Sequence, residues 1–419
     1  MTAADQNPNY LLVVTQVYVP DAASVGQHMA EAAEEMVKQG WQVQVLTSNR
    51  GYDNPNNCFP HKETVKGVHI TRLPFSSMGK KTIWHRLVGQ LSFCLQSVIR
   101  GVLGPRPSLL LITTSPPMGS LVGVLLGWLR RVPVAWWVMD INPDQALATG
   151  NAKPRSVTVR ILDFFNRQVL RQAQSIVALD RFMAATIAKK EPAAARRIHI
   201  LPPWPHESHL QRVEHATNPF RAENGLDGKF VVMYSGNHSP VHPLTTLLDA
   251  AIELANDPRL VFLFIGGGAG KQQIDELIRR HSPPNIRSIP YQPLDRIRYS
   301  LSAADLHIVS MGPAMVGIVH PCKFYGAMAL AKPILYIGPQ QSHVGEIIQS
   351  VGCGWRVDHG DVAGMVAQLR ALVAMPSAEL DAIGAKGKAV IESSLGEQIL
   401  RRQFAHLIQG INNPTKISK

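Results

Sequence analysis

Short apolar segments of strand length alternate with segments of helical periodicity through most of the chain. In the first half, the expected strands are residues 10–14, 41–47, 68–72, 109–113, 134–138 and 175–179, with a weaker one near 198–201. In the second half, they are residues 230–234, 260–265, 286–289, 306–309, 333–337 and 354–357. This alternation is typical of parallel sheets covered by helices on both faces. The sequence therefore predicts an α/β protein with two doubly wound, Rossmann-like halves.

A proline-rich segment separates the two halves. Pro202-Pro203-Trp204-Pro205 is followed by a polar stretch over 206–218, which can continue neither a helix nor a sheet. We therefore expect an N-terminal domain over 1–205 and a C-terminal domain over 206–390. The pattern becomes helical after residue 355, and a last helix is expected near 395–410, within a terminal segment over 391–419.

Length and composition restrict the class of protein. A chain of 419 residues with 45% apolar residues is long enough for two globular domains. The apolar stretch 121–139 is interrupted by Arg130, Arg131 and Pro133, so we expect no membrane-spanning helix. The first nine residues have no basic stretch ahead of an apolar one, which favours a cytoplasmic protein.

The chain carries a formal net charge of +12. This charge either reflects an anionic partner or has no specific role in binding. Among such partners we expect a phosphorylated substrate or an anionic membrane surface, and no nucleic acid. The cysteines are far apart and have no metal-binding spacing, so we expect four reduced thiols and no metal site: Cys58, Cys94, Cys322 and Cys353.

Two glycine-containing loops follow expected strands in the C-terminal half. Gly236 ends one strand ahead of a helical segment, where backbone amides and a helix N-terminus can meet a phosphate group. Gly266, Gly267 and Gly268 repeat this arrangement after the next strand. A tight turn explains one such loop equally well, but two loops in one half favour a nucleotide site.

Several further landmarks occur in a recognisable order over nearly the whole chain. They are Val17-Tyr18-Val19-Pro20-Asp21 with Val25-Gly26-Gln27-His28, then 137–144, Tyr234-Ser235-Gly236-Asn237, 264–268, Ile289-Pro290-Tyr291, Pro321-Cys322-Lys323-Phe324-Tyr325-Gly326 and Ala331-Lys332-Pro333. Together they resemble the retaining GT-B glycosyltransferases of group 1, or family 4, and in particular the transferases of colanic-acid and O-antigen synthesis. The resemblance implies two Rossmann-like domains facing across a cleft, a nucleotide-sugar donor on the C-terminal domain, and a last helix that crosses back to the N-terminal domain.

The chain departs from this family at four positions. The two glutamates that hold the donor sugar in relatives fall at Ile318 and Gly326, and the arginine and lysine on the diphosphate fall at Asn237 and His242. Lys323 can still supply a charge-assisted contact and Gly236 a backbone contact. We therefore expect an active enzyme that uses Gly236, Asn237, His242 and Lys323 on the diphosphate, although Lys323 as a plain surface lysine is the alternative.

Other candidate site residues follow from the same resemblance. Asp140 ends an apolar strand and is a candidate for contacting the acceptor or the reacting sugar, or else a helix N-cap. Gly26 and His28 are candidates on the acceptor side, with a surface histidine as the alternative. Tyr291 matches the loop whose backbone holds the nucleobase in relatives, with uridine as the default. Gly266, Gly267 and Tyr325 complete the expected donor site.

Residues 80–103 form an amphipathic helical pattern. Ile83, Leu87, Leu91, Cys94, Leu95, Val98 and Val102 fall on one side, while His85, Arg86, Gln90, Gln96, Ser97 and Arg100 occupy much of the other. With Lys80, Lys81 and Trp84, this helix either attaches the protein to anionic lipid or covers the sheet.

The sequence thus favours a hexosyl-type, retaining glycosyltransferase that moves a sugar from a nucleotide-sugar donor, with uridine as the default base. The acceptor expected is a polyprenyl-phosphate-linked, other lipid-linked or polysaccharide molecule of surface polysaccharide or glycolipid synthesis. No cofactor and no essential divalent ion are expected. A nucleotide-sugar 2-epimerase of the same fold and a non-catalytic partner subunit are the alternatives.

Overall fold

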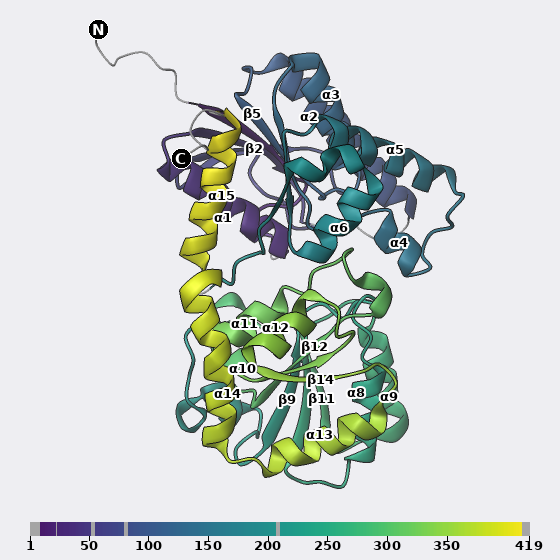
Figure 1. Cartoon of the computed structure of the whole chain (residues 1–419), viewed down its shortest axis with the longest axis vertical. Helices are drawn as coiled ribbons and strands as arrows, with labels where there is room; N and C mark the ends of the chain where they lie inside the picture. The colour runs from purple at the N-terminus through teal and green to yellow at the C-terminus, as the bar shows by residue number, and fades with distance from the viewer. Residues whose placement is uncertain (1–8, 22, 52–54, 79–82, 207–209, 413–419) are drawn as a thin grey trace. The chain divides into compact units, whose positions relative to one another are not determined.

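Two mostly parallel β-sheets organise the chain, as the alternating pattern predicts. The computed structural model describes residues 9–412 except 22, 52–54, 79–82 and 207–209. The described residues up to Pro203, together with Gly317–His320 and those from Gln398 onward, form unit 1. Trp204–Val316 and Pro321–Glu397 form unit 2 (Figure 1).

The sheet of unit 1 has the strand order β3-β4-β2-β1-β5-β6-β7-β8. Its strands are β1 (Tyr10–Val14), β2 (Gln42–Ser48), β3 (Lys62–Val65), β4 (Val68–Leu73), β5 (Leu109–Thr113), β6 (Val134–Trp137), β7 (Ser175–Ala178) and β8 (Ile198–Ile200). All neighbours pair in parallel except β3, which pairs antiparallel with β4. Strand order reverses between β1 and β5, so loops that follow β1, β5 and β6 lie around a topological switch point.

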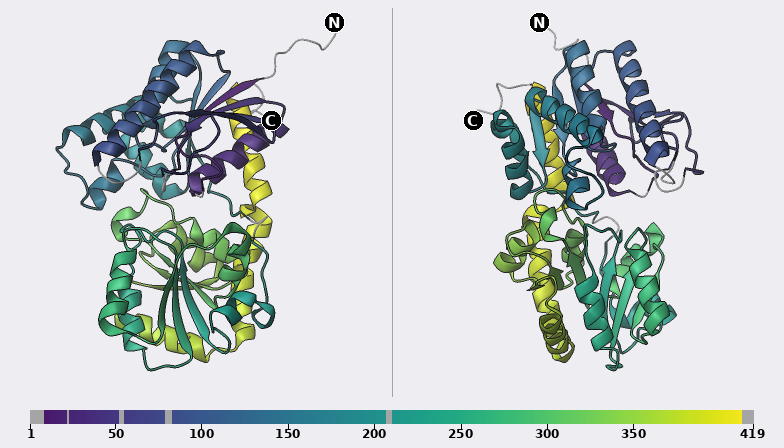
Figure 2. Two further views of the ribbon diagram at one scale, coloured as in Figure 1. Left: turned by 180° about the vertical axis from the view of Figure 1, so that it is seen from behind. Right: turned by 90° about the vertical axis from the view of Figure 1, so that its right-hand side faces the viewer.

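Helices cover both faces of this sheet because its central strands are apolar throughout. They are α1 (Ser24–Lys38), α2 (Ile83–Leu103), α3 (Gly119–Arg130), α4 (Asp144–Ala148), α5 (Val157–Gln172) and α6 (Arg181–Lys190), with a 3₁₀ turn at Pro192–Arg197. Every residue of β5 is buried, as expected for a strand covered on two sides. α2 and α3 lie side by side (Figures 1 and 2).

The last helix, α15 (Glu397–Asn412), belongs to unit 1 from Gln398 onward. Phe404 is fully buried, with its ring 4.5 Å from the ring of Trp137. Arg401 donates a hydrogen bond to the carbonyl of Glu31 on α1. These contacts fix α15 beside α1.

The sheet of unit 2 has the order β11-β10-β9-β12-β13-β14, with all pairs parallel. Its strands are β9 (Phe230–Ser235), β10 (Leu260–Ile265), β11 (Ile286–Ile289), β12 (Leu306–Ser310), β13 (Ile334–Ile337) and β14 (Gly354–Val357). Chain order runs outward in one direction from β9 and in the other from β12. The switch point of this sheet therefore lies between β9 and β12.

Alternate residues of β9 point to opposite faces of the sheet. Val232 and Tyr234 pack with one apolar cluster, which includes α8 and α13, and Val231 and Met233 pack with another, which includes α7 and α10. Figure 1 shows α8 and α9 on one side of the strands and α10 and α11 on the other. The helices are α7 (Pro219–Glu223), α8 (Thr245–Glu253), α9 (Lys271–His281), α10 (Ile297–Ser302), α11 (Lys323–Ala329), α12 (His343–Val351), α13 (Val362–Ala374) and α14 (Ser377–Val390).

Short helical turns fill the connections of unit 2. They are 3₁₀ turns at His215–Thr217, Leu294–Arg296 and Pro313–Met315, and a π-helical turn at Ile391–Leu395. Local chemistry ends the longer helices. At α12, the Ser342 hydroxyl accepts a hydrogen bond from the amide of Gly345, and Gly352 stops the helix at φ 68°.

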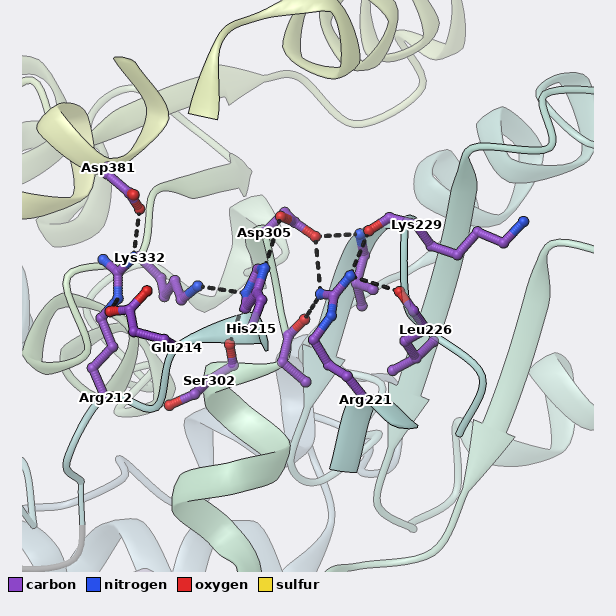
Figure 3. Close-up of polar contacts among 12 residues, drawn as sticks. Arg212, Glu214, His215, Arg221, Leu226, Lys229, Ser302, Asp305, Lys332 and Asp381 are labelled. Atoms are coloured by element: carbon purple, nitrogen blue, oxygen red, sulfur yellow. Dashed lines mark hydrogen bonds and ion pairs between the residues drawn. The ribbon is translucent and has the colours of Figure 1, made fainter. Parts of the chain in front are cut away.

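A polar network attaches the start of unit 2 to its sheet (Figure 3). The Arg221 guanidinium donates to three backbone carbonyls, of Ala303, Leu226 and Lys229. Asp305 lies 3.4 Å from the same guanidinium and accepts from the amide of Val231. The network therefore ties the segment before β9 to the strands on either side of the switch point.

His215 and Lys332 extend this network. The Lys332 ammonium lies 2.9 Å from the His215 ring, whose other nitrogen is 3.6 Å from the Asp305 carboxylate. Burial, followed by the charge of Arg212, lowers the pKa of Lys332 to about 8. Arg212 in turn pairs with Asp381 at 2.8 Å.

The predicted fold class is confirmed, and most predicted strands agree with the observed ones within about one residue. The sequence reading missed β3, a short edge strand whose residues are mostly exposed and therefore carry little apolar pattern. Among the described residues, no helix is long and apolar enough to cross a membrane.

Candidate functional site

The loop after β9 and the loop after β10 pack directly against each other. The amide of Gly236 donates to the carbonyl of Ile265, and the amide of Gly266 donates to the carbonyl of Ile289. Both glycines have positive φ, 126° at Gly236 and 133° at Gly266. This backbone region is open to glycine and strained for other residues, so the loop geometry explains both glycines.

Gly267 and Gly268 complete the contact between the two loops. The amide of His238 donates to the Gly267 carbonyl at 2.7 Å, and the amide of Gly270 donates to the His238 carbonyl at 2.7 Å. A Cβ on Gly268 would lie 2.2 Å from the Asn237 side-chain oxygen. The two predicted phosphate-binding loops thus form one backbone-lined structure, from which α9 starts at Lys271.

Lys323 reaches this structure from the other side of the switch point. It is the first residue of α11, and its ammonium donates to the Tyr234 hydroxyl at 2.5 Å. The same nitrogen lies 3.8 Å from the centre of the Tyr234 ring and 3.5 Å from the position of a Cβ on Gly236. Lys323 therefore lies at the Gly236 loop, which is predicted to bind phosphate, and burial of its nitrogen lowers its pKa to about 7.

Tyr234 contacts the predicted site residue Lys323, although it is not among the site residues expected from the sequence. Its side chain is fully buried, and its hydroxyl donates to the carbonyl of Asn237 at 2.9 Å while accepting from Lys323. The signal was present, because a tyrosine at the end of an apolar strand must find a partner for its hydroxyl. The partner itself, 89 positions away, is visible only in the fold.

His242 lies in the same region but is not a second cation. Its Nδ1 is 2.6 Å from the Ser310 carbonyl, which can only accept, so Nδ1 carries the proton and donates. Burial, followed by the charge of Lys323, lowers the pKa of His242 to about 3. The imidazole is therefore neutral at physiological pH, which changes its expected contribution from a charge to a hydrogen bond.

Two further predicted donor-site residues differ in their surroundings. Tyr291 follows β11, is 56% exposed, and donates weakly to the Gly267 carbonyl at 3.4 Å. Tyr325 is buried, and its hydroxyl lies 2.9 Å from Nε2 of His343. Tyr291 thus belongs to the loop structure, whereas Tyr325 packs inside unit 2.

Unit 1 holds the remaining predicted site residues. Asp140 follows β6, where the hydroxyl of Thr114 accepts from its amide, and burial raises the pKa of its carboxyl to about 6. Its side chain forms no N-cap. Ile318, at one missing glutamate position, accepts a hydrogen bond from Ile141 through its carbonyl, and Val319 forms a bridge with Asp140. The segment 317–320 is thus bound beside Asp140.

Gly26 and His28 lie on α1. A Cβ on Gly26 would be 3.1 Å from the backbone of Tyr18, so this glycine permits close packing of α1 on the loop after β1. His28 is 2% exposed, and its Nδ1 lies 2.8 Å from the carbonyl of Ser24. His28 is therefore buried, which rules out the alternative of a surface histidine.

The structure brings together Gly236, Asn237, His242, Gly266, Gly267, Tyr291 and Lys323 in unit 2. Tyr325 is not part of this group. Asp140, Gly26 and His28 belong to unit 1. Among the described residues, no cluster of three His, Cys, Asp or Glu side chains could hold a metal ion. No disulfide bond joins the four cysteines, all of which are among the described residues.

Two doubly wound units, with glycine loops at the switch point of the second, define the GT-B class of glycosyltransferase. Residues 24–204 match the model of the glycosyl transferase 4-like domain, and residues 217–390 match that of glycosyl transferases group 1. The chain therefore belongs to the GT-B glycosyltransferases.

Individual relatives agree with this assignment. The chain is 23% identical to WcaI of Escherichia coli, assigned to colanic acid biosynthesis, over 96% of this chain and all of WcaI. It is 26% identical to the glycosyltransferase WbjE of Pseudomonas aeruginosa, over 74% of this chain and 77% of WbjE. Anabaena HepE, solved with UDP-glucose, has the same fold, with a TM-score of 0.70 and 13% identity over 96% of this chain and 99% of HepE.

Proposed function

We propose that the chain transfers a sugar from a nucleoside diphosphate donor, UDP-linked in the first instance, to a lipid-linked or polysaccharide acceptor. The observation that carries this proposal is the position of Lys323. Its ammonium lies against the Gly236 loop, at the switch point where open α/β sheets bind ligands. A cation, a glycine loop and a helix N-terminus together suit a diphosphate.

The chemistry requires stabilisation of the leaving diphosphate. As the bond between the sugar and the phosphate breaks, negative charge grows on the phosphate oxygens and positive charge on the sugar ring. The amides of Gly236 and Gly266 already donate to the carbonyls of Ile265 and Ile289. Lys323 and the other amides of the two loops are therefore the groups proposed to stabilise the first of these charges, and preorganised groups of this kind supply a large share of catalysis. A group that acts through its own positive charge needs no bridging metal, so turnover is expected to persist with excess chelator.

The donor base and sugar are proposed from relatives. HepE was solved with UDP-glucose and with UDP, which makes uridine the first base to test. Tyr291, beside Gly267, is the candidate for the base-binding loop. A hexosyl group and retention of the anomeric configuration complete the proposal, and both rest on family resemblance.

The acceptor side is proposed for unit 1. Asp140 has a raised pKa and no side-chain partner among the described residues, so its carboxyl remains available for a hydroxyl of the acceptor or of the reacting sugar. Gly26 and His28 lie in the segment after β1 and are proposed for the acceptor side. Because His28 is buried, its proposed effect on the acceptor is indirect. WcaI, assigned to colanic acid biosynthesis, supports an acceptor in surface polysaccharide synthesis.

Attachment to an anionic membrane is part of the proposal. α2 exposes one apolar stripe: Trp84, Val88, Leu91, Leu95, Ile99 and Leu103. Phe93, Cys94 and Ser97 are buried instead, so the exposed stripe is rotated from the predicted apolar arc. No Asp or Glu occurs between residues 64 and 139, where nine Lys and Arg occur. Apolar side chains flanked by cations favour an anionic lipid surface. Lys80 and Lys81 lie outside the described residues.

A panel of nucleoside diphosphates tests the function. Binding of UDP, GDP, ADP or dTDP raises the apparent unfolding temperature in proportion to occupancy, because the ligand binds the folded state alone. A shift of the unfolding temperature with UDP and none with the others supports the proposed donor. No shift with any of the four contradicts the proposal of an active enzyme and favours a non-catalytic partner subunit. Product analysis then separates transfer to an acceptor from epimerisation of the free nucleotide sugar.

A further inference from the structure

The Lys323 ammonium has aromatic and neutral neighbours instead of an anion. It contacts the ring and hydroxyl of Tyr234, and no carboxylate of the described residues pairs with it. Partly buried cations without an anion are unfavourable unless they lose their proton or gain a partner. The site is therefore suited to a ligand that brings negative charge.

Tyr234 holds this amine in place in either protonation state. The hydroxyl proton of Tyr234 is directed to the Asn237 carbonyl, so the phenol oxygen is left as an acceptor for Lys323. An amine and an ammonium can both donate to that oxygen. Tyr234 consequently links the nitrogen of Lys323 to the backbone of the phosphate loop.

Building on the proposed donor site, we propose that Lys323 takes up a proton when the donor diphosphate binds, and that Tyr234 is the positioning residue for this step. The proton comes from solvent and forms an N–H bond on the amine, and no other bond changes. In the protein without ligand, part of the Lys323 population is neutral, and the diphosphate restores its charge. Donor binding is thus coupled to pH through a single lysine.

The other groups around Lys323 do not titrate in the same range. Burial lowers the pKa of His238 to about 4 and that of His242 to about 3. Burial raises the pKa of Tyr234 above its ordinary value, so the phenol stays protonated near neutral pH. The neighbouring Cys322 opposes the effect of burial on the pKa of Lys323 but does not cancel it. With the pKa of Lys323 at about 7, at least about half of it is neutral at pH 8.

Calorimetric titration measures the proton directly. UDP is titrated into the whole protein at pH 8 in phosphate, HEPES and Tris, whose ionisation enthalpies differ. At this pH the terminal phosphate of UDP is already ionised. The observed enthalpy is expected to change linearly with the ionisation enthalpy of the buffer, with a slope of about 0.5–1 proton taken up per UDP.

Three variants assign the proton. Lys323→Arg stays charged at every pH used, so it should bind UDP with almost no proton uptake. Lys323→Met keeps the apolar stem and should lose both uptake and most of the affinity. Tyr234→Phe keeps the ring but removes the acceptor that favours the charged amine, so the pH at which uptake is half-maximal should move downward. A purely structural role of Tyr234 would leave that pH unchanged.

The outcomes separate this inference from the proposed function. UDP binding with equal heats in all three buffers contradicts proton uptake and leaves the donor site standing. Uptake that persists in Lys323→Met assigns the proton to another group and also contradicts the inference. Absence of binding by UDP, GDP, ADP and dTDP overturns both the donor site and the inference. In the parent protein, affinity should fall about tenfold per pH unit above pH 7, and in Lys323→Arg it should stay flat.

Discussion

The carbonyl oxygen of Gly236 lies 2.1 Å from the position that a Cβ on Gly266 would occupy. No side chain can fit there, because the obstructing atom belongs to the backbone of the neighbouring loop. The two glycines at positive φ therefore hold the loops after β9 and β10 at one fixed separation. Lys323 lies beside the first of these loops, with its nitrogen 3.5 Å from the position of a Cβ on Gly236.

Replacing Gly266 by alanine should disrupt the donor site. The Cβ of the alanine would clash with Gly236, and the alanine would have to adopt a φ of 133°. We therefore expect Gly266→Ala to abolish UDP binding and to destabilise unit 2 by at least about 2 kcal/mol. Gly228→Ala is the matched control, because Gly228 has φ 69° and no atom within 4 Å of its Cβ position. Binding by calorimetry and thermal unfolding should separate the two variants, and equal binding by both would contradict this account of the loops.

Asp140→Asn should stabilise unit 1 above pH 6. The carboxyl pKa is about 6 in the folded protein and about 4 in an unfolded chain, so folding stability falls as pH rises from about 4 to 6 and then stays low. The amide removes this cost, which is on the order of 2–3 kcal/mol. Thermal unfolding should show a stabilised variant at pH 7.5 and no difference at pH 4. Transfer activity should fall, since the carboxyl is proposed to contact a substrate hydroxyl.

Asp163→Asn provides the control for Asp140. Burial alone would raise the pKa of Asp163, but hydrogen bonds from Lys190 and Arg167 outweigh it and lower that pKa. The ionised carboxyl is therefore stabilising, and its loss should destabilise the protein at pH 7.5. If Asp140→Asn also destabilises at that pH, the carboxyl of Asp140 has a partner and its proposed availability is wrong.

Asp305→Asn should weaken unit 2 through the network of Figure 3. Asp305 is the carboxylate between Arg221 and His215, and its loss leaves Arg221 without an ion pair at a buried position. Removing one partner of a buried pair costs about 3–5 kcal/mol, whereas a surface pair contributes about 0–1 kcal/mol. Asp257, paired with the exposed Arg259, supplies that comparison. Similar denaturant midpoints for Asp305→Asn and Asp257→Asn would show that the network contributes little.

Membrane attachment should depend on the exposed stripe of α2. Trp84 is 74% exposed and Leu95 62% exposed, so replacing both by serine should leave folding intact while reducing sedimentation with anionic vesicles at least threefold. Leu294→Ser, at an exposed leucine of unit 2, is the control. Salt should release the parent protein from the vesicles. A variant with glutamine at four basic positions should bind them less at low salt: Lys80, Lys81, Arg86 and Arg100. Equal sedimentation of all variants, or none at low salt, would mean that α2 only covers the sheet.

The sequence predicts the layers of the fold well because their signals are local. Buried strands such as β10 are continuous apolar runs, and glycines at positive φ mark the loops that follow them. The edge strand β3 has no such run, since its residues face solvent on an open edge. Local pattern therefore identifies the core strands and misses an edge strand.

The site is only partly predictable, for a different reason. Gly236, Gly266 and Lys323 can be selected one by one, but the contact between Lys323 and Tyr234 joins α11 and β9, two elements that are distant in the sequence. The exposed stripe of α2 is a similar case, because the apolar pattern alone does not reveal which part of it α3 covers. The neutrality of His242 likewise depends on its burial in the fold and on the charge of Lys323, which is distant in the sequence.

The most direct test of the central claim is calorimetric binding of UDP to the parent protein, to Lys323→Ala and to Lys229→Ala. Lys229 lies in the same unit, where it donates to the carbonyl of Pro258. We predict that Lys323→Ala weakens binding by about 1–3 kcal/mol, the range for losing a charge-assisted contact, and that Lys229→Ala binds as the parent does. Equal affinity of all three folded proteins for UDP would contradict the assignment of Lys323 to the donor diphosphate.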